Sequence, residues 1–212
     1  MPSFRYEMRC EGELGSIRIA GIDEVGRGPL AGPVMAAVAV IDRTLAKRKL
    51  LRLIDDSKKL ALEDREKAYD AMIASGVVRF ALGVASVAEI DAINILHASL
   101  LAMRRAVEEL GMEPQEVWTD GLYTPAVRFT CRAIVKGDSR VGAISAASIL
   151  AKTARDAEMC ELDKSYPAYG FARHKGYSSP EHLAALKQHG PCEIHRMSFE
   201  PVWATLQHDL PF

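Results

Sequence analysis

Four acidic residues stand at places in the sequence where a β-strand is expected to end. Asp23 and Glu24 follow an apolar run, and Asp120 and Asp138 each adjoin a glycine. Strand ends on one edge of a sheet can converge, and carboxylates brought together repel one another unless cations neutralise them. Mg²⁺ and Mn²⁺ prefer such oxygen ligands, and two neighbouring ions can activate water and stabilise a leaving oxygen in phosphodiester hydrolysis.

A structural role is the alternative for these acids, because Asp beside Gly is common in turns. For Asp120 or Asp138 taken alone, a turn explains the residue better than a metal does. The pair Asp23 and Glu24 is harder to explain in this way, because a turn needs no second acid. Adjacent residues of a regular strand point to opposite faces, so this pair can share one site only if the strand bends there.

Glycines follow the first acid pair, in the stretch GRGPLAGP that begins at Gly26. Glycine lets the backbone approach a ligand closely, and Arg27 between Gly26 and Gly28 can reach a phosphate. The stretch does not match the dinucleotide fingerprint, because prolines interrupt it and a strand follows. No Gly-Lys-Ser/Thr of a P-loop is present either. A tight hairpin between two strands is a compatible alternative.

The segment YPAYGFARHKGY, residues 166–177, mixes aromatic and basic side chains. Aromatic rings can stack on sugars or bases while cations hold phosphates. A loop held on the core by its aromatic residues explains the pattern equally well.

Two further patterns resemble catalytic or metal motifs. Ser148 and Lys152 are one residue too far apart for the S-x-x-K nucleophile, and Lys152 is expected to support nearby acids or bind a phosphate. His189, Cys192 and His195 have spacing that could hold zinc. A structural zinc site needs four ligands and no fourth is evident, so we do not expect one.

The composition is that of a globular protein, with 212 residues, of which 49% are apolar and 26% charged. The four cysteines are scattered, which predicts reduced thiols and a cytoplasmic location. We find no apolar run of about 18 residues, so no membrane span is expected. The net charge of −1 does not indicate a nucleic-acid binder. Lys and Arg nevertheless cluster in residues 43–59, 128–140 and 173–175, as solvated faces or as contacts to a nucleic-acid backbone.

Periodicity predicts the elements that position these residues. We expect strands over residues 16–23, 34–41, 77–85, 116–120 and 130–135, and helices over 60–74, 86–110 with a break near Ile93, and 141–164. This order predicts an α/β fold, a mixed sheet flanked by helices. We expect a catalytic core over residues 1–165, with residues 1–15 flexible or peripheral, and a helical, loop-rich C-terminal region over residues 166–212 that contacts substrate.

Seven motifs in order resemble the type 2 ribonuclease H family, and more narrowly bacterial ribonuclease HII. They are GIDEVGRGPLAGPV, DDSKKL, IDAINILHASLLAM, TDG, KGDSRVGAISAASILAKTARD, YGFARHKGY and GPCEIHRMSF, and they extend from about residue 21 to residue 199. The resemblance implies a ribonuclease H-like core that hydrolyses the RNA strand of RNA–DNA hybrids. It also implies incision 5′ to a ribonucleotide embedded in duplex DNA, leaving a 5′-phosphate and a 3′-hydroxyl.

The motif match also implies roles for individual residues. It makes Asp23, Glu24, Asp120 and Asp138 the catalytic acids, which bind two Mg²⁺ or Mn²⁺ ions. It makes Gly26, Arg27 and Gly28 a loop that senses the 2′-hydroxyl, and Tyr177 a ring that stacks at the RNA-to-DNA junction. From the clustered basic residues and the helix over residues 141–164, we add Lys58 and Lys152 as expected substrate-binding residues. A bare backbone suits contact with a 2′-hydroxyl, the group that distinguishes RNA from DNA. Ser178 and Ser179 depart from the family pattern, which leaves the loop after Tyr177 undefined.

The expected partners are RNA–DNA hybrids and ribonucleotide-containing duplex DNA, bound by a monomer. The C-terminal HDLPF has no clear clamp-binding peptide. Ribonuclease H-like cores host several nucleases, so one alternative is cleavage of DNA junctions or single strands by the same acids. A second is a hybrid-binding module without catalysis, which leaves the four acids unexplained. A third is a Mg²⁺ enzyme for small molecules, which leaves the Arg27 loop and the aromatic segment without a use.

Overall fold

A single mixed sheet forms the centre of the protein in the computed structural model, which describes residues 4, 7–8, 18–54 and 60–207. Its strands are β1 (Ile19–Val25), β2 (Val34–Ile41), β3 (Val78–Ala85), β4 (Glu116–Asp120) and β5 (Thr130–Ile134), in the order β3-β2-β1-β4-β5. β1, β4 and β5 are mutually parallel, whereas β2 is antiparallel to both neighbours. The carboxyl ends of β1, β4 and β5 therefore lie at one edge of the sheet. The mixed sheet and its helices confirm the predicted fold class.

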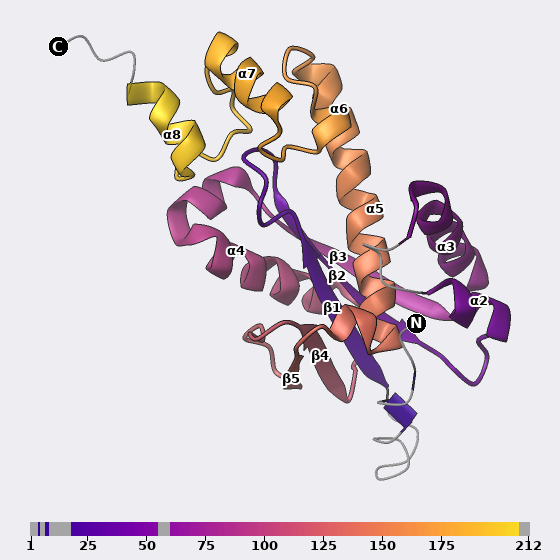
Figure 1. Cartoon of the computed structure of the whole chain (residues 1–212). Coiled ribbons are helices and arrows are strands. Elements are labelled where there is room, and N and C mark those ends of the chain that lie inside the picture. Colours follow the sequence, from indigo (N-terminus) through magenta and orange to yellow (C-terminus); the bar gives the residue numbers. More distant parts are fainter. Residues whose placement is uncertain (1–3, 5–6, 9–17, 55–59, 208–212) are drawn as a thin grey trace.

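Helices cover both faces of the sheet (Figure 1). They are α2 (Arg48–Leu53), α3 (Leu62–Ser75), α4 (Val87–Glu109) and α5 (Gly142–Ser165), followed by the short C-terminal helices α6 (Phe171–His174), α7 (Pro180–His189) and α8 (Glu200–Gln207). Side chains alternate along β2, as a strand requires. Ala36 and Val38 pack with α4, and Ala37 and Ala39 pack with α5. This alternation explains the continuous apolar run VMAAVAVI, because both faces of β2 are buried.

Gly21 lets the beginning of α5 lie directly against β1. A Cβ at Gly21 would overlap the backbone of Ala143, which belongs to the first turn of α5. The approach is therefore closer than any side chain at this position would permit. It fixes α5 beside the strand that carries Asp23.

Most element boundaries agree with the predicted ones. The bounds of β2 and β4 are those predicted, and α4 contains the expected break, at Asn94, whose φ of 64° and ψ of 166° are not helical. One strand end was wrong: β1 continues to Val25, so Asp23 and Glu24 lie within the strand. The helix α2 was not predicted. No helix within the described ranges is long and apolar enough to cross a membrane.

The C-terminal helices lie beyond the far end of α5, next to the loop between β1 and β2 (Figure 1). The N–H of Gly32 donates to the carbonyl of Ile194 over 2.9 Å, and the N–H of Arg196 donates to the carbonyl of Leu30 over 2.9 Å. The glycine-rich loop is thus paired with a segment far along the chain. The division of the chain at residue 165, where α5 ends, stays a prediction.

Candidate active site

Three aspartates meet at the C-terminal ends of the parallel strands β1, β4 and β5. Ile22 of β1 pairs with Thr119 of β4 in parallel register, so the next residues, Asp23 and Asp120, are neighbours. Asp138 comes from the short 3₁₀ helix η1 (Gly137–Ser139), which follows β5. Each aspartate offers an oxygen atom, and these three oxygens lie within 4.8 Å of one another. The structure therefore brings together three of the four predicted acids.

The backbone holds two of these acids in place. The N–H of Gly137 donates to Oδ1 of Asp120 over 2.6 Å, which joins the end of β4 to the turn after β5. Lys136 has a positive φ of 56°, which turns the chain so that Asp138 follows at the sheet edge. Asp23 and Asp138 are both only 5% exposed. Burial of this kind is costly for carboxylates unless a positive charge compensates it.

Glu24 is not a member of the three-aspartate group. β1 stays paired with β2 at Asp23 and Glu24, opposite Ala37 and Ala36, so the strand is regular through both acids and does not bend between them. Glu24 Oε1 instead accepts a hydrogen bond from Nη1 of Arg27 at 3.1 Å. Burial raises the pKa of Glu24, the charge of Asp120 raises it further, and Arg27 opposes both effects. Glu24 thus lies near enough to Asp120 for the two charges to interact. Its role as a metal ligand stays a prediction.

A cavity of about 450 Å³ lies beside the aspartates. It collects predicted residues from three separate parts of the sequence, together with Arg65, which was not predicted. The lining consists of Asp23, Glu24, Val25, Gly26, Arg27, Gly28, Arg65, Ser148, Lys152 and Tyr177. Lys58, the remaining predicted residue, lies outside the described residues.

Asp156 holds two cations at this cavity. Its carboxylate accepts from Nζ of Lys152 at 2.7 Å and from Nη2 of Arg65 at 3.1 Å. All three side chains are largely buried, so water screens these pairs less than it screens surface pairs. The arrangement fixes two positive groups where an anionic substrate could enter. Arg65 carried no sequence signal, because helix α3 has charged residues along much of its length.

Two buried arginines hold the glycine-rich loop from the inside. Arg155 and Arg196 are both fully buried. Arg196 donates to the carbonyls of Gly26, Arg27 and Gly32, and Arg155 donates to those of Ala31, Pro33 and Lys175. Burial lowers the pKa of both guanidinium groups, and that of Arg196 falls to about 9.

These bonds determine which way the loop amides point. In a trans peptide the N–H points opposite to the preceding carbonyl, and the described chain has no cis peptide. The carbonyls of Gly26 and Arg27 are turned toward Arg196, so the N–H groups of Arg27 and Gly28 point away from it. The loop therefore offers donors on the side opposite to its buried arginine.

The structure explains the need for glycine at the first position of the loop, Gly26, but not at the next one, Gly28. Gly26 has φ of 88°, and a Cβ there would overlap the guanidinium of Arg155. At Gly28 a Cβ would make an ordinary contact, 3.6 Å from Cε1 of Tyr177. Sequence reasoning missed Arg155, although its spacing of four residues from both Ala151 and Met159 places it on the buried face of α5.

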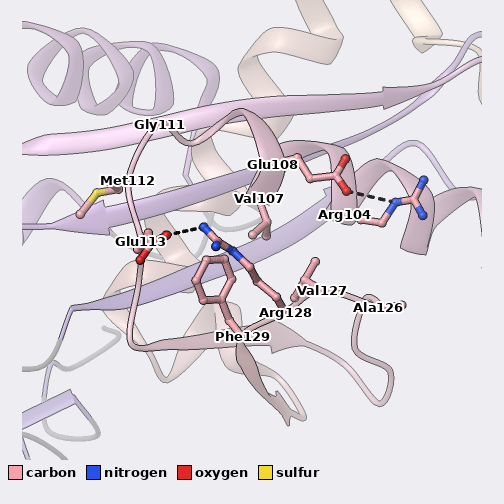
Figure 2. Close-up of a pocket in the computed structure, with 10 residues that line it drawn as sticks. All are labelled: Arg104, Val107, Glu108, Gly111, Met112, Glu113, Ala126, Val127, Arg128 and Phe129. Carbon is pink, nitrogen blue, oxygen red and sulfur yellow. Dashed lines mark hydrogen bonds and ion pairs between the residues drawn. The ribbon is translucent and has the colours of Figure 1, made fainter.

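A second hollow, of about 750 Å³, has a different character (Figure 2). Its charged residues neutralise one another, since Arg104 pairs with Glu108 and Arg128 with Glu113. The floor is made of apolar side chains such as Val127 and Phe129, which pack on the core. None of the predicted site residues lines it. The smaller cavity is therefore the candidate site, because of the two it is the one that joins the clustered acids to the outward-pointing amides of the glycine-rich loop.

Comparisons with known proteins show which family the chain resembles. The family described as Ribonuclease HII matches residues 20–202. Ribonuclease HII of Nitrosococcus oceani is 53% identical over 185 residues, covering 87% of this chain and 90% of that protein. Ribonuclease HII of Burkholderia ambifaria is 50% identical over 184 residues, covering 87% and 82%. Among solved structures, ribonuclease H2 from Pyrococcus horikoshii superposes with a TM-score of 0.73 at 28% identity, covering 91% of this chain and 98% of that one.

Proposed function

The chain belongs to the ribonuclease HII family, and we propose that this metal-dependent ribonuclease H incises duplex DNA on the 5′ side of an embedded ribonucleotide. The products would carry a 5′-phosphate and a 3′-hydroxyl. Activity on RNA–DNA hybrids is the broader property of the family, and recognition of a single ribonucleotide is the finer one that we propose.

The metal ligands that we propose are Asp23, Asp120 and Asp138, with Glu24 beside them. Their donor atoms are all carboxylate oxygens, three of which lie within 4.8 Å of one another, and this set suits Mg²⁺ or Mn²⁺. Two such ions would activate the attacking water and stabilise the leaving 3′-oxygen. The carboxylates themselves would position the ions beside the cavity. A neighbouring solved structure, a ribonuclease HIII described as a complex with Mn²⁺, has the same fold.

Substrate recognition is proposed for the loop of residues 26–28 together with Tyr177, which we call the junction-recognition site. The N–H groups of Arg27 and Gly28 point away from Arg196 and can donate to a ribose 2′-hydroxyl. The Tyr177 ring, 45% exposed, can pack against the following deoxyribose. Arg65 and Lys152, held by Asp156, can contact phosphates without selecting sequence.

One observation carries this proposal: the three-aspartate group lies next to a glycine-rich loop whose amides at Arg27 and Gly28 point away from the buried Arg196. A general nuclease needs the acids but has no use for such a loop. The loop gives the acids a way to select a ribonucleotide.

The decisive experiment compares two duplexes of one sequence, with and without a single ribonucleotide. We expect incision only of the first, on the 5′ side of the ribonucleotide, with Mg²⁺ or Mn²⁺ and not with chelator. Equal cleavage of both duplexes would reject the proposal in favour of a DNA nuclease. Binding of a hybrid without cleavage under any divalent ion would favour a non-catalytic module.

A further inference from the structure

Two buried histidines form a hydrogen-bonded chain that ends at the backbone of Tyr177. Nδ1 of His182 lies 2.8 Å from the carbonyl oxygen of Tyr177, and Nε2 of His182 lies 3.1 Å from Nε2 of His195. Nδ1 of His195 lies 2.9 Å from the amide nitrogen of Cys192. Both rings are essentially inaccessible to solvent. The proposed metal and substrate roles use neither of them.

The backbone groups at the two ends of this hydrogen-bonded pair of imidazoles determine which ring nitrogens carry protons. The Tyr177 carbonyl can only accept, so Nδ1 of His182 carries a proton. The Cys192 amide can only donate, so Nδ1 of His195 is bare. With both rings neutral, His195 carries its proton on Nε2 and donates it to the bare Nε2 of His182. If either ring were cationic, both of its nitrogens would carry a proton, and one N–H would point at another N–H. Only the pair of neutral rings therefore satisfies all three contacts.

The surroundings keep the pair neutral. His174 stacks on His182 with ring centroids 4.5 Å apart, and it is itself held between the Tyr169 carbonyl and the Gly176 amide. The rings of Phe171 and Tyr169 cover His195. Cys192 is a further titratable neighbour: its Sγ lies 3.1 Å from Nδ1 of His195, and burial raises the pKa of its thiol. Burial lowers the pKa of His182 and of His195, and the neighbouring histidines lower both further.

These contacts also make a zinc site unsuitable here. Both ring nitrogens of His195 are used within the chain of hydrogen bonds. Within the described ranges, the aspartates are the only group of three or more candidate ligands close enough to hold a metal ion. His195 is therefore engaged by hydrogen bonds on both ring nitrogens.

The imidazole chain joins the two parts of the junction-recognition site. His195 forms a β-bridge with Ala31 of the glycine-rich loop, and Leu30 N–H donates to the Gly176 carbonyl at 2.7 Å. His182 lies at the start of α7, with its N–H donated to the capping Ser179. The same Ser179 donates its N–H to the Tyr177 carbonyl at 2.8 Å, so Ser179 caps α7 within the loop that the sequence left undefined.

We propose that His182 is a positioning residue for Tyr177, and that His195 fixes the tautomer in which His182 can act. By donating to the Tyr177 carbonyl, His182 fixes the backbone at Tyr177 and so keeps the tyrosine ring next to Gly28. This inference rests on the proposed function, because it assigns His182 an effect on junction recognition. It is independent of the metal site.

The tautomers can be observed directly by long-range ¹H–¹⁵N correlation of the histidine rings at pH 7. We expect His182 as the Nδ1–H form and His195 and His174 as Nε2–H forms. A cationic His182, or His182 protonated on Nε2 alone, would overturn the inference. This measurement needs no substrate, so it stands even if the incision assay rejects the proposed function.

Two substitutions at position 182 separate positioning from packing. His182→Asn places an amide donor near the former Nδ1 and can keep the Tyr177 bond, whereas His182→Gln reaches only the former Nε2 position. The readout is kcat/KM for a single-ribonucleotide duplex divided by kcat/KM for a hybrid whose RNA strand has no junction with DNA. Loss of one buried hydrogen bond corresponds to about a tenfold change.

We expect this ratio to fall about tenfold in His182→Gln and to stay within about threefold of wild type in His182→Asn. Tyr177→Ala should lower the ratio as well, and adding His182→Gln to it should lower it no further. An equal loss on both substrates would show that His182 only stabilises the fold, and would overturn the proposal. So would an additive effect in the double variant.

Discussion

The ring of Tyr177 lies against the backbone of Gly28, at a distance where a single methyl group on Gly28 would touch Cε1 at 3.6 Å. The two residues are far apart in the sequence: Gly28 lies in the loop after β1, and Tyr177 lies just before α7. Their contact places the backbone amide of a glycine and an exposed aromatic ring side by side in the junction-recognition site. Two of the motifs found in the sequence therefore act as one surface.

Gly28→Ala tests this surface with little cost to the fold. Its φ is not positive and the added methyl makes an ordinary contact, so the free energy of unfolding should change by less than about 1 kcal/mol. The methyl would occupy space between the amide and a ribose, so incision at a single ribonucleotide should fall about tenfold or more. Gly26→Ala is the contrasting variant. Its positive φ and the overlap with Arg155 should destabilise the protein by at least about 1–2 kcal/mol in denaturant unfolding.

Asp120→Asn tests the metal assignment. Asn keeps an acceptor for the Gly137 N–H but removes the charge. Turnover should fall at least about 100-fold, while affinity for the uncleaved duplex stays close to wild type. Mn²⁺ should raise the thermal midpoint of wild type by mass action and should not raise that of the variant. Glu116→Gln, at the other end of β4, is the matched control, and an equal loss in that variant would contradict the assignment.

Arg196→Lys tests the support beneath the loop. Lysine keeps a positive charge but cannot make the forked contacts to three loop carbonyls. We expect a loss of at least about 3 kcal/mol in the free energy of unfolding, because buried carbonyls lose charged donors. Arg128→Lys is a control on an exposed pair, and it should cost no more than about 1 kcal/mol. Equal effects of the two substitutions would show that the loop does not depend on Arg196.

Periodicity was sufficient to predict most of the sheet and the break in α4. The run VMAAVAVI has the length and valine content of a strand buried on both faces, and that pattern depends on local residues alone. The end of β1 was placed too early because an acid pair was taken to end a strand. Here tertiary structure prevailed, since Asp23 and Glu24 keep their partners in β2.

Most of the site could be predicted because its residues occur in motifs, whereas its supports could not. Asp120 and Asp138 each adjoin a glycine and fall in a motif of the resemblance. Arg196 binds carbonyls more than 160 positions away, and only the folded chain brings them together. The same holds for His182 and His195, whose neutral pairing depends on which backbone group lies at each end.

The buried His195 should make the stability of the fold depend on pH. Its pKa is lowered from about 6.5 to about 4 by burial and by the neighbouring histidines. Above pH 6.5 the ring is neutral in both the folded and the unfolded chain, and its contribution to stability is complete. As the pH falls from 6.5 to 4, the unfolded chain takes up a proton that the folded chain refuses, so stability decreases. The total loss from this ring is on the order of 3 kcal/mol.

His195→Asn removes this titration while keeping an acceptor near the Cys192 amide. The variant should be less stable than wild type at pH 7, because it loses packing and the contact with His182. Its free energy of unfolding should nevertheless decline less steeply between pH 6.5 and pH 4.5, by up to about 1.4 kcal/mol per pH unit. Urea unfolding at a series of pH values measures both quantities. An unchanged slope in His195→Asn would show that His195 is not a buried neutral group.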